Sequence, residues 1–170
     1  HHQNLNTGDG FLLALVWLLR LIEAEGLTWW GTVCSSFIWL ARGHRRRTKQ
    51  AAQGNAKVPS VAQGNKMVSR MALLLALCYS KSLGWALEQP RNSLMVFHPA
   101  MLYLCSRIRA AGLHLWSIQT FMGAFDGETL KPHTIYSNEC WIKALERRHP
   151  GKVGVGGSSD VVKKWVDAAG

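Results

Sequence analysis

The sequence is poor in acidic residues. It contains 10 Asp and Glu against 20 Lys and Arg, which gives a formal net charge of +10 at pH 7. Such an excess of positive charge favours an anionic partner, and nucleic acid is the commonest one. A basic protein that binds no polyanion has the same composition, so charge alone leaves both interpretations open.

Cysteines are few and widely spaced. Cys34, Cys78, Cys105 and Cys140 form no C-x-x-C pair. The sequence therefore predicts neither a zinc site nor a disulfide framework. This cysteine usage fits a reducing, intracellular compartment, and a nuclear location agrees with it.

Long apolar runs are absent too. The run FLLALVWLL has nine residues, whereas a bilayer-spanning helix needs about 20. The N-terminal residues show no charged segment with a cleavage site, so no signal peptide is expected, and the sequence reads as the interior of a longer protein. We expect no stable membrane insertion, and the sequence leaves the oligomeric state open.

What the sequence does contain is an alternation of helical and strand patterns. We expect helices over residues 7–25, 67–81, 99–111 and 138–148, and strands over 27–33, 83–87, 113–121 and 134–136. Strands without polar alternation are typical of a parallel sheet covered on both faces. The sequence predicts an α/β fold with a Rossmann-like, doubly wound, mostly parallel sheet. The first helix is apolar on nearly every side, so we expect it to be buried against that sheet.

Two segments differ from this pattern. Residues 41–66 are a basic loop by composition, and residues 151–170 read as a Gly-rich linker followed by a short C-terminal helix. The sequence thus predicts one α/β domain over residues 1–150 and a tail.

Two of the predicted strands end on residues that can carry chemistry. The first delivers Cys34, Ser35 and Ser36, and the second delivers Glu88 and Gln89, with Ser93 shortly after. Ligands bind at the carboxyl ends of the strands in an open parallel sheet. If the two strands are neighbours, the thiol and the carboxylate share one edge.

The basic loop is expected at the same edge. Its arginines, Arg42, Arg45, Arg46 and Arg47, are candidates for holding phosphate and for lowering the pKa of the Cys34 thiol. Structural interpretations stand beside these. Cys34 fits a small buried apolar residue, Glu88 fits a partner for Arg91, and the arginines fit a solvated loop.

The order GTVCSSF, GWALEQP and TFMGAFDGETLKPHTIYSN, over about residues 27–148, resembles the catalytic core of DNA cytosine-5 methyltransferases, most closely the divergent phage and protist methylase-like members. The resemblance implies that Cys34 is the nucleophile that adds to cytosine C6. It implies that Glu88 holds the base near N3, that Lys131 lies in a loop at the pocket, and that the base is flipped out of the duplex.

The resemblance also implies S-adenosylmethionine as cofactor. No F-x-G-x-G loop precedes residue 27, so the cofactor-binding residues are not seen and the sheet is expected to be incomplete at its N-terminal side. We expect a methyltransferase core that is truncated or inactive alone. The alternative is a non-enzymatic basic module that binds nucleic acid, DNA rather than RNA, or another partner. Peripheral membrane attachment through helix 7–25 and the arginine loop is a third interpretation.

Overall fold

A computed structural model describes residues 4–21, 26–38, 42–125 and 131–147. Its elements, in chain order, are α1 (Gly8–Arg20), β1 (Leu27–Trp30), α2 (Arg42–Arg45), α3 (Pro59–Ser80), β2 (Gly84–Pro90), η2 (Met95–Phe97), α4 (Pro99–Ala110), β3 (Trp116–Phe121), η3 (Met122–Phe125), β4 (Pro132–Ser137) and η4 (Cys140–Leu145). The predicted linker and helix after residue 150 lie outside the described residues.

The four strands form one mixed sheet in the order β1-β2-β4-β3. β1 and β2 are parallel neighbours, whereas β4 runs antiparallel to both β2 and β3. Two of the three strand pairings are therefore antiparallel, and the predicted doubly wound, mostly parallel Rossmann-like sheet is wrong. The reason lies in the short connection between Phe121 and Pro132, whose described part, residues 122–125, is the 3-10 helix η3. A connection that short reverses the chain, because parallel neighbours need a crossover of a dozen or more residues.

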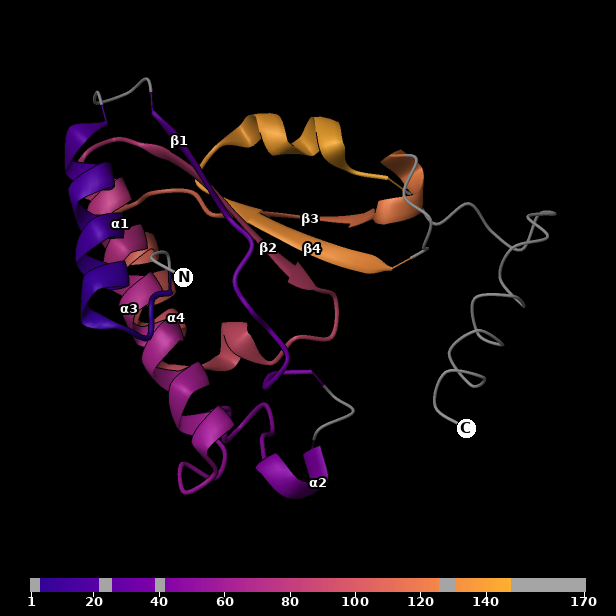
Figure 1. Ribbon diagram of the computed structural model, residues 1–170. Coiled ribbons are helices and arrows are strands. Elements are labelled where there is room, and N and C mark those ends of the chain that lie inside the picture. Colours follow the sequence, from indigo (N-terminus) through magenta and orange to yellow (C-terminus); the bar gives the residue numbers. More distant parts are fainter. Residues whose placement is uncertain (1–3, 22–25, 39–41, 126–130, 148–170) are drawn as a thin grey trace, which may run out of the picture.

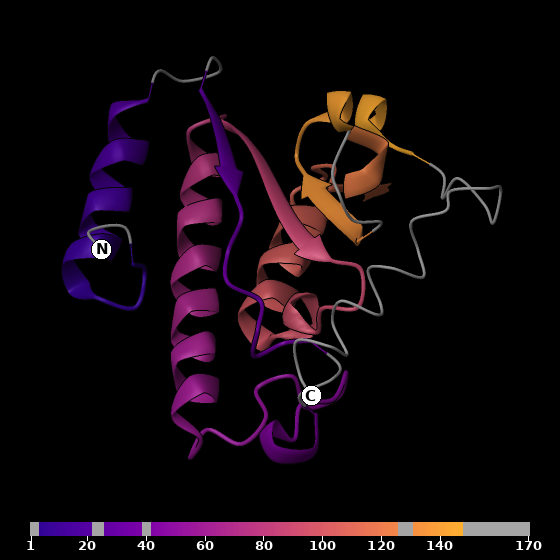
Figure 2. The ribbon, with the colours of Figure 1, turned by 45° about the vertical axis from the view of Figure 1, so that its right-hand side comes forward.

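Helices α1, α3 and α4 form a layer on one face of the sheet, and η4 lies on the other (Figures 1 and 2). The larger core lies between the helices and the sheet and includes Met71, Leu75, Trp85 and Leu87. A smaller core of Ala86, Ile118, Ile135 and Ile142 lies beneath η4. Alternate residues of β2 thus face different cores, as the two-residue period of a strand requires.

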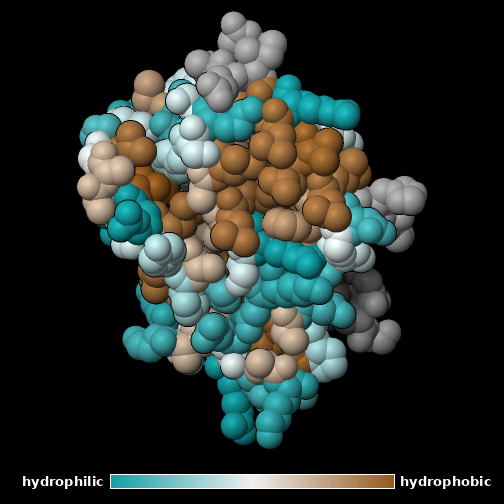
Figure 3. Space-filling view, turned by 90° about the vertical axis from the view of Figure 1, so that its left-hand side faces the viewer, coloured by the Kyte–Doolittle hydropathy of each residue, from teal (hydrophilic) through white to brown (hydrophobic). Residues whose placement is uncertain are grey.

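Helix α1 begins where the sequence indicates, because Thr7 is its N-cap and the Thr7 hydroxyl accepts a hydrogen bond from the Gly10 amide. The expectation that this helix is buried is wrong. Its apolar residues Leu12, Val16, Trp17 and Leu19 are 40–55% exposed. α1 packs on α3, and its outer face is part of a broad apolar surface (Figure 3).

Helix α3 begins eight residues earlier than predicted, because residues 59–66 have the composition of the basic loop. Pro59 stands at the first helical turn, where its missing amide costs nothing. Gly64 and Asn65 weaken the helical pattern there, yet the helix is held by tertiary contacts with the preceding loop. The true non-helical part is therefore shorter than 41–66, and α2 interrupts it.

The remaining boundaries differ at the ends of elements. Helix α4 is followed by Gly112 at φ 68°, which confirms the predicted stop. Asn138 was expected to cap a last helix. It instead accepts a bond from the Trp85 amide at 2.8 Å and donates to the Leu83 carbonyl at 2.9 Å, which ties β4 to the start of β2.

Candidate functional site

Cys34 lies beyond the end of β1, at the start of a tight turn. Residues 31–34 continue past the strand without regular structure, and the Phe37 amide donates to the Cys34 carbonyl at 2.7 Å. The side chain is half-buried and packs against the larger core. Ser35 is exposed and Ser36 is buried, so the turn presents only one of its two hydroxyls to solvent.

The Cys34 thiol is not activated in this structure. Burial raises its pKa, a backbone hydrogen bond lowers it, and the negative charge of Glu88 raises it further, with a net upward shift. The expectation that the basic segment lowers the pKa of this thiol is therefore wrong. A thiolate at Cys34 is scarce at neutral pH unless a ligand changes its surroundings.

Glu88 lies within β2 rather than after it, because the strand continues to Pro90. Its side chain projects from the face of the smaller core and is 33% exposed. One carboxylate oxygen, Oε1, contacts Nδ1 of His133 on β4. Pairing of Pro90 with His133 and of Glu88 with Ile135 makes Glu88 and His133 diagonal neighbours on one face.

The carboxylate–imidazole contact is the ion pair found among residues 4–21, 26–38, 42–125 and 131–147. His133 is 13% exposed and has its Nε2 atom left for a further partner. His133 was not among the predicted site residues, because the last strand was expected to start at residue 134, two residues after its actual start at Pro132. The observation that identifies His133 is the antiparallel register of β2 and β4, which places His133 across from Pro90.

Gln89 and Ser93 were expected to bind substrate, but both are buried and occupied by internal bonds. Gln89 donates through Nε2 to the Thr32 hydroxyl at 3.1 Å and to the Glu88 carbonyl at 2.7 Å. Its Oε1 accepts from the Ser93 hydroxyl at 3.0 Å, and that hydroxyl accepts from the Met95 amide. These bonds fix the segment after β1 against the end of β2.

Cys34 and Glu88 lie at the same end of the sheet, Cys34 beyond the carboxyl end of β1 and Glu88 near the carboxyl end of β2. Thr32, two residues before Cys34, bonds to Gln89, the residue after Glu88. The Glu88 charge is close enough to raise the pKa of Cys34. The two side chains approach from different sides, because Cys34 packs on the helical layer and Glu88 projects from the opposite face.

The four arginines of the basic segment have different surroundings. Arg42 begins α2. Arg45 donates to the Ser35 carbonyl, which anchors the turn after Cys34. Arg46 is exposed, and Arg47 is 2% exposed. The four arginines are close in sequence but do not share one structural role.

Arg47 is a structural residue. Its Nη2 atom donates to the Ser36 hydroxyl at 3.2 Å and to the Val61 carbonyl at 3.1 Å. Its Nη1 atom donates to Asn65 Oδ1 at 2.8 Å and to the Ala52 carbonyl. The guanidinium lies 3.7 Å from the Phe37 ring centroid. Burial, with a smaller effect of Arg45, lowers the pKa of Arg47 to about 10, so it stays charged at neutral pH. This placement leaves it no surface for phosphate.

Lys131 is exposed and directly precedes β4. Its carbonyl accepts from the Met122 amide at 3.2 Å, and the next residue, Pro132, accepts from the Arg91 amide at 3.0 Å. Lys131 therefore stands at the same end of the sheet as the Glu88–His133 pair.

Among the described residues we find no group of three or more His, Cys, Asp or Glu side chains that could hold a metal ion. A surface pocket is lined by Arg46, Ala51, Gly54, Asn55 and Lys57. It offers no carboxylate for the ribose hydroxyls or the amino group of S-adenosylmethionine. The lining of this pocket therefore does not fit this cofactor, and we derive no step through it.

Searches of protein-family models, curated proteins and solved structures found no match to this chain. Within the described residues, no helix combines the length and apolarity needed to cross a membrane.

Proposed function

We propose that this chain is a DNA cytosine-5 methyltransferase-like protein whose described residues form the base-binding side of the site. The observation that carries the proposal is the placement of Cys34 and Glu88 at the same end of two adjacent parallel strands, which the Gln89–Thr32 hydrogen bond ties together. A carboxylate can hold the protonated N3 edge of a pyrimidine, and a thiol can add to its C6 atom. His133 orients the carboxylate through its Nδ1 atom.

The chemistry proposed for this chain is the addition of the thiol across a pyrimidine double bond. The Cys34 sulfur forms a bond to C6 as thiolate, and the electron pair of the C5–C6 double bond moves to C5. A proton from solvent is taken up at C5, and the thiol proton is released to solvent. The step is balanced without a cofactor. Because burial raises the thiol pKa, we expect the addition to be slow at neutral pH and faster as the pH rises.

The test uses an oligonucleotide that contains 2-pyrimidinone, a cytosine analogue without the 4-amino group and therefore more electrophilic at C6. Intact-mass spectrometry measures the covalent adduct. We expect the adduct with the wild type and with Cys140→Ser, which removes an exposed cysteine, and no adduct with Cys34→Ser. Glu88→Gln should slow the addition by about 100-fold, as for loss of a general acid–base group. An adduct that survives Cys34→Ser, or none up to about pH 9, contradicts the proposal.

A second candidate is a non-enzymatic module that binds nucleic acid. The raised thiol pKa favours it, because it leaves Cys34 mainly in the unreactive thiol form. Salt-dependent DNA binding that is unchanged in Cys34→Ser, together with no adduct in the wild type, would support the module and not the enzyme.

A further inference from the structure

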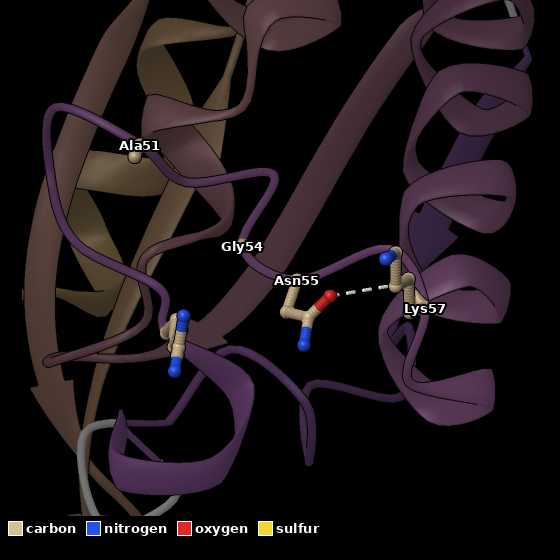
Figure 4. Close-up of a pocket in the computed structure, with 5 residues that line it drawn as sticks. Ala51, Gly54, Asn55 and Lys57 are labelled. Atoms are coloured by element: carbon tan, nitrogen blue, oxygen red, sulfur yellow. Dashed lines mark hydrogen bonds between the residues drawn. The ribbon is translucent and has the colours of Figure 1, made fainter.

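The pocket next to α2 has a volume of about 410 Å³. That is within the range of small-ligand sites, about 300–1,000 Å³. It is lined by Arg46 and by residues of the loop 51–57, which leads directly into α3 (Figure 4). The lining contains two cations, one amide and no acidic side chain.

The loop that lines the pocket packs closely against the segment of Arg45, Arg46 and Arg47. The Arg47 side chain points inward to α3 and the Ser36 hydroxyl, and its neighbour Arg46 is exposed and adopts φ 52°. Gly54 adopts φ 59°, and a Cβ atom there would lie 2.5 Å from the Arg45 carbonyl oxygen. The two segments of the loop therefore approach so closely at Gly54, which lines the pocket, that only glycine fits there.

The polar groups of the pocket are donors. Asn55 accepts a bond from the Lys57 amide through Oδ1 at 3.1 Å, which leaves its Nδ2 group as a donor. Figure 4 shows the Asn55 oxygen turned toward Lys57 and the nitrogen pointing away from that bond. Arg46 and Lys57 are exposed and add a guanidinium and an ammonium group.

The positive charge of the pocket is not balanced by nearby acids. The sequence contains no Asp or Glu between Glu25 and Glu88. Neither Arg46 nor Lys57 forms an ion pair with a described residue. Donor groups that line one pocket and carry uncompensated positive charge attract an anion with several acceptor oxygens.

We propose that this pocket binds a phosphate group of a nucleic-acid strand. The inference rests on the nucleic-acid substrate of the proposed function and assigns Arg46, Asn55 and Lys57 as its phosphate contacts. The pocket is linked to the candidate base site, because Arg45 and Arg47, on either side of Arg46, bond to Ser35 and Ser36 just after Cys34. A strand held by its backbone here is thus anchored to the turn that carries the thiol.

The experiment measures binding of a fluorescent DNA duplex to the full chain by anisotropy, from about 50 to about 200 mM salt. The variants are Arg46→Gln, Lys57→Gln and their combination. The matched control is Arg107→Gln, an exposed arginine on α4 that does not line the pocket. We expect the slope of log K against log salt to fall by about 0.9 for each single variant and about 1.8 for the double variant. The control should keep the wild-type slope.

Arg46→Gly provides a second variant, because it removes the charge and relieves the left-handed backbone at this residue. It should weaken DNA binding as Arg46→Gln does while keeping the wild-type melting temperature or raising it. A loss of binding through misfolding would instead lower the melting temperature.

Equal slopes in all variants, or an equal change in Arg107→Gln, would overturn the proposal, because the charge would then act diffusely. Inorganic phosphate at matched ionic strength tests the other source of the same chemistry. If it binds the pocket and the duplex does not, the nucleic-acid assignment is overturned. The adduct test at Cys34 is independent, since a short oligonucleotide at high concentration needs no phosphate pocket. The phosphate-binding proposal and the proposed function can therefore fail separately, and each test identifies which one has failed.

Discussion

Replacement of Arg47 is the sharpest test of how the basic segment is built. Its two terminal nitrogens donate to Ser36, Val61, Asn65 and the Ala52 carbonyl, and the side chain is 2% exposed. Arg47→Ala leaves buried acceptors without donors. Each such group costs about 1–3 kcal/mol.

Not every one of these acceptors loses its last hydrogen bond in Arg47→Ala. The Val61 carbonyl lies within α3, where a helical amide also serves it, so the Ser36 hydroxyl and the Ala52 carbonyl account for most of the loss. With the lost packing on the Phe37 ring, and with relief of the buried charge as an offset, we expect Arg47→Ala to lower the free energy of unfolding by about 3–5 kcal/mol. A domain has about 5–15 kcal/mol in total, so this is a large fraction.

The measurement is urea unfolding followed by tryptophan fluorescence, to which the buried Trp85 contributes. Arg47→Met keeps much of the apolar stem and should recover part of the loss. Arg46→Gln, at the exposed neighbour, should stay within about 0.5 kcal/mol of the wild type. An Arg47→Ala protein within about 1 kcal/mol of the wild type would refute the assignment of Arg47 as a structural residue.

Three further outcomes are expected. His98 is buried, and this burial, with a smaller effect of the Arg47 charge, lowers the pKa of its imidazole. The unfolded chain therefore binds the proton more readily than the folded chain. The free energy of unfolding should fall as the pH drops below about 6.5. Gly64→Ala places a Cβ 2.4 Å from the Ser36 hydroxyl oxygen and should cost about 1–3 kcal/mol in urea unfolding, although alanine favours helix. Cys34 should react with iodoacetamide at pH 7 about tenfold more slowly than the exposed Cys140.

Each of these has a control. His98→Asn keeps a cap acceptor for the Ala100 amide and should remove the stability slope below neutral pH; a slope that persists contradicts the histidine assignment. Gly8→Ala meets no atom within 4 Å and should be neutral or stabilising. Peptide mass spectrometry measures the alkylation rates of Cys34 and Cys140. Equal rates would argue against a raised pKa of the Cys34 thiol.

Local patterns predicted much of the secondary structure. The cap at Thr7, the stop at Gly112 and the positions of β1, β2 and α4 follow from nearby residues alone. The order of the sheet did not follow, because direction depends on how the chain crosses between strands. The connection between Phe121 and Pro132 was the available signal, since it is too short for a helical crossover.

Only the part of the candidate site that depends on the order of the strands could be predicted from the sequence. Cys34 and Glu88 stand at the ends of adjacent parallel strands, and that relation follows from the strand pattern. The three consecutive arginines look equivalent in the sequence, yet Arg47 is buried because Phe37 and the first turns of α3 surround it. No local signal separates it from Arg46.

β1 forms one outer boundary of the sheet, and it consists of Leu27, Thr28, Trp29 and Trp30. It carries no charge and no proline, the features by which proteins usually protect such a strand, and Leu27 and Trp29 are about half exposed. Its outward backbone groups are open to a further strand in the part of the chain described. At high concentration, molecules of this chain are therefore expected to associate through β1 by strand addition. The net charge of +10 opposes this association at low ionic strength, and added salt screens the charge and favours it.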